Sequence, residues 1–396
     1  MTPSFLISGD LLQDTHRYLR PALAVGVILL ILSIIGGIFS PSDFFRSYLL
    51  GYLFWFGLTL GSMAVVMMQY LTGGAWGVVV RRPLESAMRT LPVVALLFVP
   101  IVFGLHSLYE WDDPAAVRRE PVLAHRSVYM NPGFFIIRAI IYFAIWAVFA
   151  YFLNRWSVEE DEHGSRQRKL EALSAPGLIV YVFTSTFAAV DWAESLESHW
   201  YSTMWGFLFV AAQGLATMGF AIVVLAWLWK REPMRNILKP VHFHDLGKLL
   251  LMFVMLWAYF AFAQLLIVWA GNLTDEIPWY FHRLSNSWGW LGVMLIVLQF
   301  MVPFVLLLWR SLKRNAVLLS AVVGLLLFMR FVDLMWIVMP GYYQHGFRLH
   351  WLNICLPLAI GGIWVATFLW QLSRRPLLPL GAPNLEAALH HEEPAA

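Results

Sequence analysis

A few ionisable side chains fall inside long apolar segments of this 396-residue chain. Asp191 lies near the end of one such segment, and Arg138 lies about two helical turns into another. Arg330 and Asp333 are three residues apart in a third segment, so a helix would bring them to one face. Such groups are costly in a bilayer, face a bundle interior, and pair or become neutral. The two acids are therefore candidate proton carriers and the two arginines their counter-charges, although a purely structural ion pair explains the spacing equally well.

Acidic residues follow Asp191 where its segment ends. Glu194 and Glu197, together with His199, lie in a stretch without Lys or Arg, so like charges are expected to raise the proton affinity of the carboxylates. His106 and Glu110 are spaced by four residues and are predicted to share a helix face at the same level. These groups suggest an outer mouth for protons, and ordinary acidity of an outer loop is the alternative interpretation.

Polar side chains deeper in the apolar segments can either extend a proton relay through water or simply join helices. Near mid-membrane they are Gln213, Thr217, Tyr259 and Gln264, and at the opposite end His242, His244, Asp245 and Lys248 cluster where a helix is expected to begin. For each single residue the ordinary role is favoured: helix contacts for the first group, and a charged helix start for the second.

Membrane helices must position all these groups. The chain is 60% hydrophobic and 13% charged, which is too apolar for a domain dissolved in water. The pattern predicts an all-α integral membrane protein with about ten spans, and most of them reach the length needed to cross a bilayer of about 30 Å. The expected spans are 22–39, 47–71, 91–109, 132–153, 177–193, 201–229, 246–269, 285–309, 316–338 and 351–372.

Positive charge is distributed unevenly over the loops. Of 27 Lys and Arg residues, 19 lie at the termini and in the loops after even-numbered spans, and six lie in the other loops. The positive-inside rule therefore places the N-terminal segment 1–21 and the tail 373–396 in the cytoplasm. We expect the mixed charges of 159–171 to be a solvated helical loop, and the tail to be disordered or laid on a partner.

A weak internal repeat divides the membrane domain 22–372. Phe187–Trp192 and Phe328–Leu334 both end apolar segments with Val-Asp, and an aromatic, His-bearing loop follows each. Four helices separate them, which predicts two four-helix bundles, 47–193 and 201–338, flanked by helices 22–39 and 351–372.

Redox cofactors are not expected on this chain. Its single cysteine, Cys355, cannot hold an iron–sulfur cluster alone, and no Cys-x-x-Cys-His haem motif is present. The histidines lie at the ends of spans or in loops, which excludes a haem ligated by two histidines within the bundle. We also expect no metal site and no nucleic-acid partner.

Several local strings resemble a known family. They are residues 134–146 (FFIIRAIIYFAIW), 187–192 (FAAVDW) with 195–203 (SLESHWYST), and 244–248 (HDLGK) with Trp257-Ala258-Tyr259 and Gln264. The chain resembles the ActF subunit of bacterial alternative complex III, which is related to ActC and to the NrfD/polysulfide-reductase membrane subunits. The likeness covers the ten spans.

This resemblance implies a multi-pass subunit of the bacterial inner membrane, within a respiratory quinol:electron-acceptor oxidoreductase that delivers electrons to cytochrome c or a terminal oxidase. It implies partners that carry haem c and iron–sulfur clusters (a multihaem cytochrome c and an iron–sulfur subunit), and an ActC-like subunit that oxidises quinol. The chain itself would hold no redox centre, with a quinone or lipid as its one conceivable ligand, and its polar residues would form a proton path.

Two other functions remain open. A secondary transporter would use the buried charges and the mid-span Pro100 and Pro303, although those prolines do not occupy corresponding positions of the two bundles. A purely structural anchor for peripheral redox subunits explains the resemblance equally well.

Overall fold

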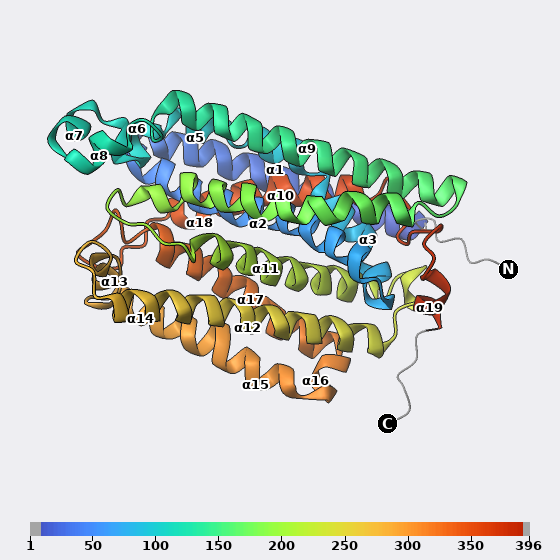
Figure 1. Ribbon diagram of the computed structural model, residues 1–396. Coiled ribbons are helices and arrows are strands. Elements are labelled where there is room, and N and C mark those ends of the chain that lie inside the picture. Colours follow the sequence, from blue (N-terminus) through green and yellow to red (C-terminus); the bar gives the residue numbers. More distant parts are fainter. Residues whose placement is uncertain (1–8, 391–396) are drawn as a thin grey trace.

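The computed structural model describes residues 9–390, and throughout that part of the chain it is helical and contains no strand (Figure 1). Ten helices are long and apolar enough to cross a membrane, which confirms the predicted fold class. The spans are α1 (Gly9–Phe39), α2 (Pro41–Thr72), α3 (Ala75–Met88) with α4 (Leu91–Leu96) and α5 (Val99–Phe103), α9 (Pro132–His163), α10 (Gln167–Trp192), α11 (Trp205–Leu228), α12 (Pro240–Gly271), α14 (Trp288–Met294) with the π-helix η4 (Leu295–Met301) and α15 (Val302–Leu308), α17 (Ala316–Val338) and α18 (Leu352–Leu372).

Short helices occupy the connections between these spans. They are α6 (Leu105–Leu108), η1 (Glu110–Asp112), α7 (Pro114–Arg119), α8 (Pro121–Arg126), η2 (Glu194–Leu196), η3 (Met234–Asn236), α13 (Ile277–Leu284), α16 (Arg310–Arg314) and α19 (Leu385–Leu389). The start of α1 and helix α19 lie at one end of the bundle (Figure 1). We call this the basic end, because most Lys and Arg residues lie there, and the other the far end, which the positive-inside rule places outside the cytoplasm.

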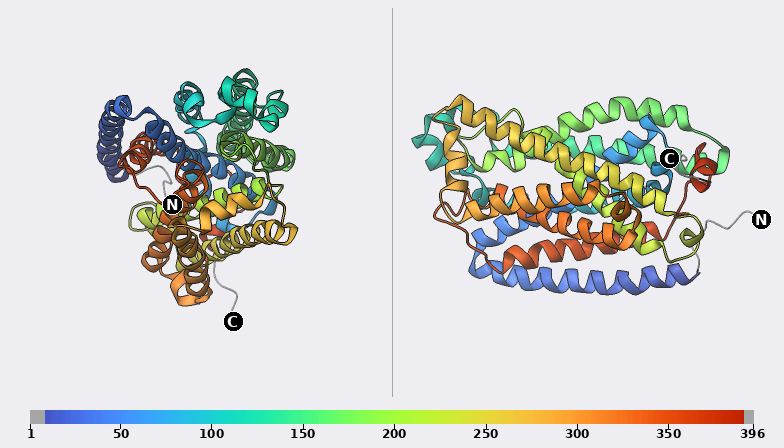
Figure 2. Two further views of the ribbon diagram at one scale, coloured as in Figure 1. Left: turned by 90° about the vertical axis from the view of Figure 1, so that its left-hand side faces the viewer. Right: turned by 90° about the horizontal axis from the view of Figure 1, so that it is seen from below.

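Helices α2 and α11 form the centre of the bundle. About 83% of the apolar window of each is buried, against 11% for α1, so α1 lies at the periphery. Both α10 and α17 contact α2 and α11, while α1 packs along α18, which in turn packs on α2 (Figure 2). In the predicted four-helix repeat, α2 corresponds to α11 and α10 to α17.

The third span begins earlier than the sequence indicated. Residues 75–90 were expected to be a loop, but α3 is a buried helix there. Arg81 donates to Glu160 (2.5 Å), Arg82 donates to Glu85 (2.6 Å), and Arg82 also pairs with Asp161. Because these charges are neutralised by one another, α3 can enter the bundle despite its polar residues.

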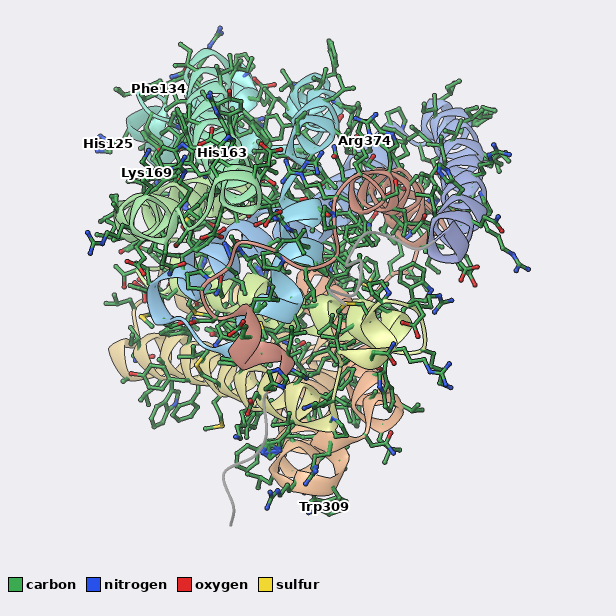
Figure 3. The ribbon with its side chains drawn as sticks, turned by 90° about the vertical axis from the view of Figure 1, so that its right-hand side faces the viewer. His125, Phe134, His163, Lys169, Trp309 and Arg374 are labelled. Atoms are coloured by element: carbon green, nitrogen blue, oxygen red, sulfur yellow. The ribbon has the colours of Figure 1, made fainter. Side chains whose placement is uncertain are left out.

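This network also corrects the interpretation of 159–171 as a solvated run. Glu160 is fully buried, and Asp161 is mostly covered. Figure 3 shows this basic end, with His163 and Lys169 labelled near the α9–α10 turn and Arg374 labelled near the end of α18.

The C-terminal tail is ordered up to residue 390 rather than disordered. Leu377 and Leu378 are fully buried, and the Gly381 amide donates to the Asp161 carboxylate (3.2 Å). Helix α19 packs on α3, and the Ala388 carbonyl lies 3.1 Å from Nε2 of His242. The tail therefore covers the basic end of its own chain, which explains why it does not need a partner to become ordered.

Candidate functional site

Asp191, near the end of α10, is held by two residues of α9. Arg138 donates to both carboxylate oxygens at 2.9 Å, and the Tyr142 hydroxyl donates at 3.0 Å. The guanidinium also donates to the Tyr129 carbonyl (2.8 Å) and lies over the rings of Tyr129 and Phe134. Asp191 is fully buried and lines none of the cavities described below. This geometry is that of a saturated ion pair which joins two helices.

Asp333 on α17 has a different environment. Its counter-charge Arg330 comes from the same helix, as the spacing predicted, and Trp257 of α12 donates to it (3.2 Å). When the side-chain amide of Gln299 is oriented to satisfy both its oxygen and its nitrogen, the same Trp257 N–H is shared with the Gln299 oxygen (3.2 Å), and the Gln299 nitrogen donates to the Met329 carbonyl (2.9 Å). Gln299 lies in η4, and π-helical segments frequently mark functional sites because they displace the helix ladder locally.

A pocket of about 540 Å³ lies beside Asp333, between α12, α13, the eighth span and α17. Its wall is mostly apolar, and Gln264, Tyr280 and Trp336 are among the residues that add polar atoms to the lining. Gln264 is buried, and its Oε1 has no hydrogen-bond partner. Nε1 of Trp336 also has none. Both residues line the pocket, although these two atoms are themselves covered, and unsatisfied polar groups beside an apolar cavity are a feature of ligand sites.

A much smaller cavity of about 10 Å³ lies between the two halves of the bundle. Arg330 lines it from α17, Ser185 from α10 and Gln213 from α11. Gln213 accepts hydrogen bonds from Tyr181 (2.6 Å) and Ser185 (3.5 Å). The space is of the order of one water molecule, and it places polar groups of α10 and α11 beside Arg330 on the side away from the larger pocket.

The acidic residues after Asp191 are not an unneutralised cluster. Arg283 of α13 donates to Glu197 (2.5 Å), the Ser202 amide donates to Glu194, and His199 pairs with Glu120 (2.8 Å). Burial lowers the pKa of Arg283, and the Glu197 carboxylate opposes that shift. The expected like-charge repulsion is therefore offset at Glu197, because Arg283 reaches it from a helix that is distant in sequence, whereas Glu194 is met by a backbone amide that carries no full charge.

His106 and Glu110 do not share a helix face. Helix α6 ends at Leu108, and the chain is extended at Tyr109, which breaks the predicted periodicity. The His106 side chain is 73% exposed and lies 3.9 Å from Asp112, whereas Glu110 accepts from Ser198 (2.7 Å). His106 is thus at the far-end surface and is not enclosed with Asp191.

The remaining candidates lie in different surroundings. Thr217 is fully buried at the contact of α11 with α2, and Tyr259 is mostly exposed at the rim of the pocket beside Asp333. Lys248 pairs with Asp245 (3.0 Å) at the basic end, where α12 begins. This pair precedes Trp257, the α12 residue that donates to Asp333, by more than two helical turns.

Sequence reasoning missed the groups that complete the site. Gln299 was the detectable one, because it is the one amide within the apolar residues 288–309 and is followed by Pro303. Trp257 and Trp336 could not be distinguished from the many aromatic residues at lipid-facing positions, and Arg283 was counted only as a loop charge.

Comparison with protein-family models and with curated proteins finds no match for this chain. The structure is that of a multi-pass, all-helical membrane protein. Its Asp191 is saturated by Arg138, and its Asp333 lines a pocket among the membrane-spanning helices.

Proposed function

We propose that the chain is an integral membrane subunit of a respiratory quinol:electron-acceptor oxidoreductase, and that Asp333 takes up and releases protons within it. Redox centres and the quinol-oxidising site would belong to partner subunits, namely a multihaem cytochrome c, an iron–sulfur subunit and an ActC-like subunit. The resemblance of the spans to ActF supports the complex. The observation that carries the proton role is the carboxylate of Asp333, which is buried and lines the 540 Å³ pocket.

The two buried acids have different roles in this proposal. Asp191 is saturated by Arg138 and Tyr142, so a proton there would have to displace a bidentate partner. Asp333 has Arg330 on one side and the pocket on the other, so a proton donor can reach it. We therefore assign proton transfer to Asp333 and helix locking to Asp191.

The matched substitutions Asp333→Asn and Asp191→Asn test this division in the purified complex. Quinol oxidation and the accompanying proton release are measured per assembled complex, and assembly is quantified by the subunits that co-purify. We expect Asp333→Asn to slow turnover by roughly 100-fold, the usual contribution of a proton-transfer group. Asp191→Asn should lower the yield of complex while leaving turnover of the assembled fraction unchanged.

Each other outcome supports a different function. Unchanged turnover in both variants would mean that the chain is a structural anchor. Purification without redox subunits, together with solute uptake by vesicles that contain the chain alone, would mean that it is a transporter.

A quinone-class ligand is a second proposal for the pocket, favoured by the unpartnered Gln264 Oε1. A quinol hydroxyl can donate to this oxygen while its tail extends into lipid. Because Trp257 and Trp279 line the pocket, a water-soluble menaquinone analogue should quench the tryptophan fluorescence of the chain at saturable concentration. Gln264→Leu should weaken this quenching about 5–10-fold, the value of one hydrogen bond to a buried group.

Gln69→Leu is the control for that experiment, because Gln69 is also buried with an unpartnered Oε1 but lies outside the pocket. Equal quenching of both variants and the unaltered chain would exclude a hydrogen bond to Gln264.

A further inference from the structure

A second and larger cavity runs along the outside of the bundle between the third span and α9. Its volume is about 1050 Å³, and it extends from Arg89 and Arg155 at the basic end to Phe103 and Ile136 in the far half. Residues 136–155 of α9 span about 28 Å, close to the thickness of a bilayer core of about 30 Å. We call this cavity the α5–α9 groove.

The floor of the groove is made by small side chains. Ala139, Ala144, Ala147 and Ala150 line it from α9, and Ala95 lines it from α4. The walls are apolar, with almost no polar surface along most of the length. Its depth and composition suit an extended hydrocarbon chain, because no hydrogen-bonding group along the floor needs a partner.

The end of the groove at the basic end is cationic. Arg89, Arg155 and Arg375 all line it there. Arg155 pairs with Glu159 (2.9 Å), and Arg375 lies 3.7 Å from Glu85.

Glu85 does not neutralise this mouth, since it also accepts from Arg82 (2.6 Å) and Ser157 (2.6 Å). Arg89 has no carboxylate within ion-pair distance among the described residues, and its buried Nη1 has no hydrogen-bond partner. Arg89 therefore lines the groove with a charge that no carboxylate of the described chain neutralises, and an anion in the groove supplies that partner.

We propose that the α5–α9 groove binds one anionic phospholipid of the leaflet at the basic end. Arg89 holds its phosphate, with Arg155 and Arg375 around the headgroup, and one acyl chain lies along the alanines of α9. Basic pockets between membrane helices on the cytoplasmic side suit such headgroups, and the charge distribution of this chain places the groove mouth on that side. The inference does not depend on the role of Asp333.

Native mass spectrometry of the full chain, titrated with phosphatidylglycerol or with phosphatidylethanolamine of the same acyl chains, tests this proposal. We expect a saturable first binding event for phosphatidylglycerol only. Arg89→Gln should weaken it about fivefold, the contribution of one basic residue to anionic lipid binding. The matched control Arg168→Gln removes an exposed charge at the same end, outside the groove, and should leave binding unchanged.

A second variant keeps the experiment decisive if Arg89→Gln does not fold. Ala147 lies exposed on the groove floor, so Ala147→Phe fills the groove without altering any charge. It should abolish the saturable event. Equal binding of the two lipids, or equal weakening by Arg89→Gln and Arg168→Gln, would overturn the proposal.

A partner helix is the other conceivable occupant. The double variant Ala147→Cys/Cys355→Ser, carrying a photoreactive cross-linker on its new thiol, distinguishes the two in the purified complex. Cross-linking to lipid is expected, and cross-linking to a protein subunit would assign the groove to a protein interface instead.

Discussion

The Arg138–Asp191 pair allows a quantitative prediction about stability. Arg138→Gln leaves a fully buried carboxylate with no charged partner, although the Tyr142 hydroxyl still donates to it at 3.0 Å. Removing one partner of a buried ion pair typically costs about 3–5 kcal/mol, because the other charge stays desolvated. We therefore expect Arg138→Gln to lower the free energy of unfolding by about that amount.

The converse change should cost less. In Asp191→Asn, Arg138 retains the Tyr129 carbonyl at 2.8 Å and the ring faces of Tyr129 (3.8 Å) and Phe134 (4.6 Å). Such cation–π contacts contribute about 0.5–2 kcal/mol each in desolvated sites, so the guanidinium is partly compensated. We expect a loss of about 1–3 kcal/mol, set by the hydrogen bonds to charge that disappear.

The double variant Arg138→Gln/Asp191→Asn completes the cycle. Two amides can hydrogen-bond without buried charge, so the double variant should be more stable than the sum of the single effects predicts, with a coupling of about 1–3 kcal/mol. Unfolding is followed by tryptophan fluorescence in mixed detergent micelles, where Trp192 adjoins the pair. Additivity within about 0.5 kcal/mol would refute the reasoning, since distant and independent sites behave that way.

Three further substitutions probe the packing of the bundle. Gly61→Ala places a Cβ 2.3 Å from Thr217 Oγ1 and 2.8 Å from a backbone oxygen of α11, so it should destabilise the chain by about 1–3 kcal/mol, and Thr217→Ala should recover only part of that loss in the same unfolding assay. Glu160→Gln removes the shorter of the two ion pairs of the buried Arg81, whose other partner Glu85 lies at 3.5 Å, and should lower the thermal midpoint in detergent; an unchanged midpoint would mean that the Arg81–Glu160 pair is not needed. Gly381→Ala would bring a Cβ within 1.9 Å of the Glu160 backbone oxygen, so limited proteolysis should cleave the tail faster than in the unaltered chain, and equal cleavage would contradict the tail packing.

Hydropathy and charge were sufficient to predict the membrane class, the ten spans and the contact of Arg330 with Asp333. Each of these depends on local sequence: span length on apolar runs, and the contact on helical spacing. The start of the third span was not predictable in this way. Arg81 and Arg82 look like loop charges until Glu160 and Asp161, about 80 residues later, are placed beside them.

The environments of the acids at the far end were likewise unpredictable from local sequence. Glu197 meets Arg283 from α13, and Asp191 meets Arg138 from α9, so tertiary packing neutralises charges that appear unpaired in their own loops. The pocket beside Asp333 depends on η4, whose altered helical ladder around Gln299 has no signature in an apolar run apart from the amide itself and the proline that follows.

The origin of the counter-charge explains why only one of the two acids reaches a pocket. Arg138 extends to Asp191 from the neighbouring helix, so its guanidinium and the Tyr129 and Phe134 rings fill the space between α9 and α10. Arg330 reaches Asp333 from the same helix. The eighth span then needs no charged side chain next to the acid, and the 540 Å³ pocket occupies that space.

Filling this pocket should therefore stop function without breaking the ion pair. Ala258 lines the pocket from α12, and Ala258→Phe adds a ring there while leaving Arg330 and Asp333 intact. We expect the assembled complex to lose at least about 10-fold in quinol turnover, with an unchanged free energy of unfolding, because the added ring excludes ligand and water from the carboxylate. Ala24→Phe, at an exposed position of α1, is the control for added bulk at a lipid-facing surface. If both variants turn over like the unaltered complex, access to Asp333 through the pocket is not part of the reaction, and its carboxylate serves only to hold α17.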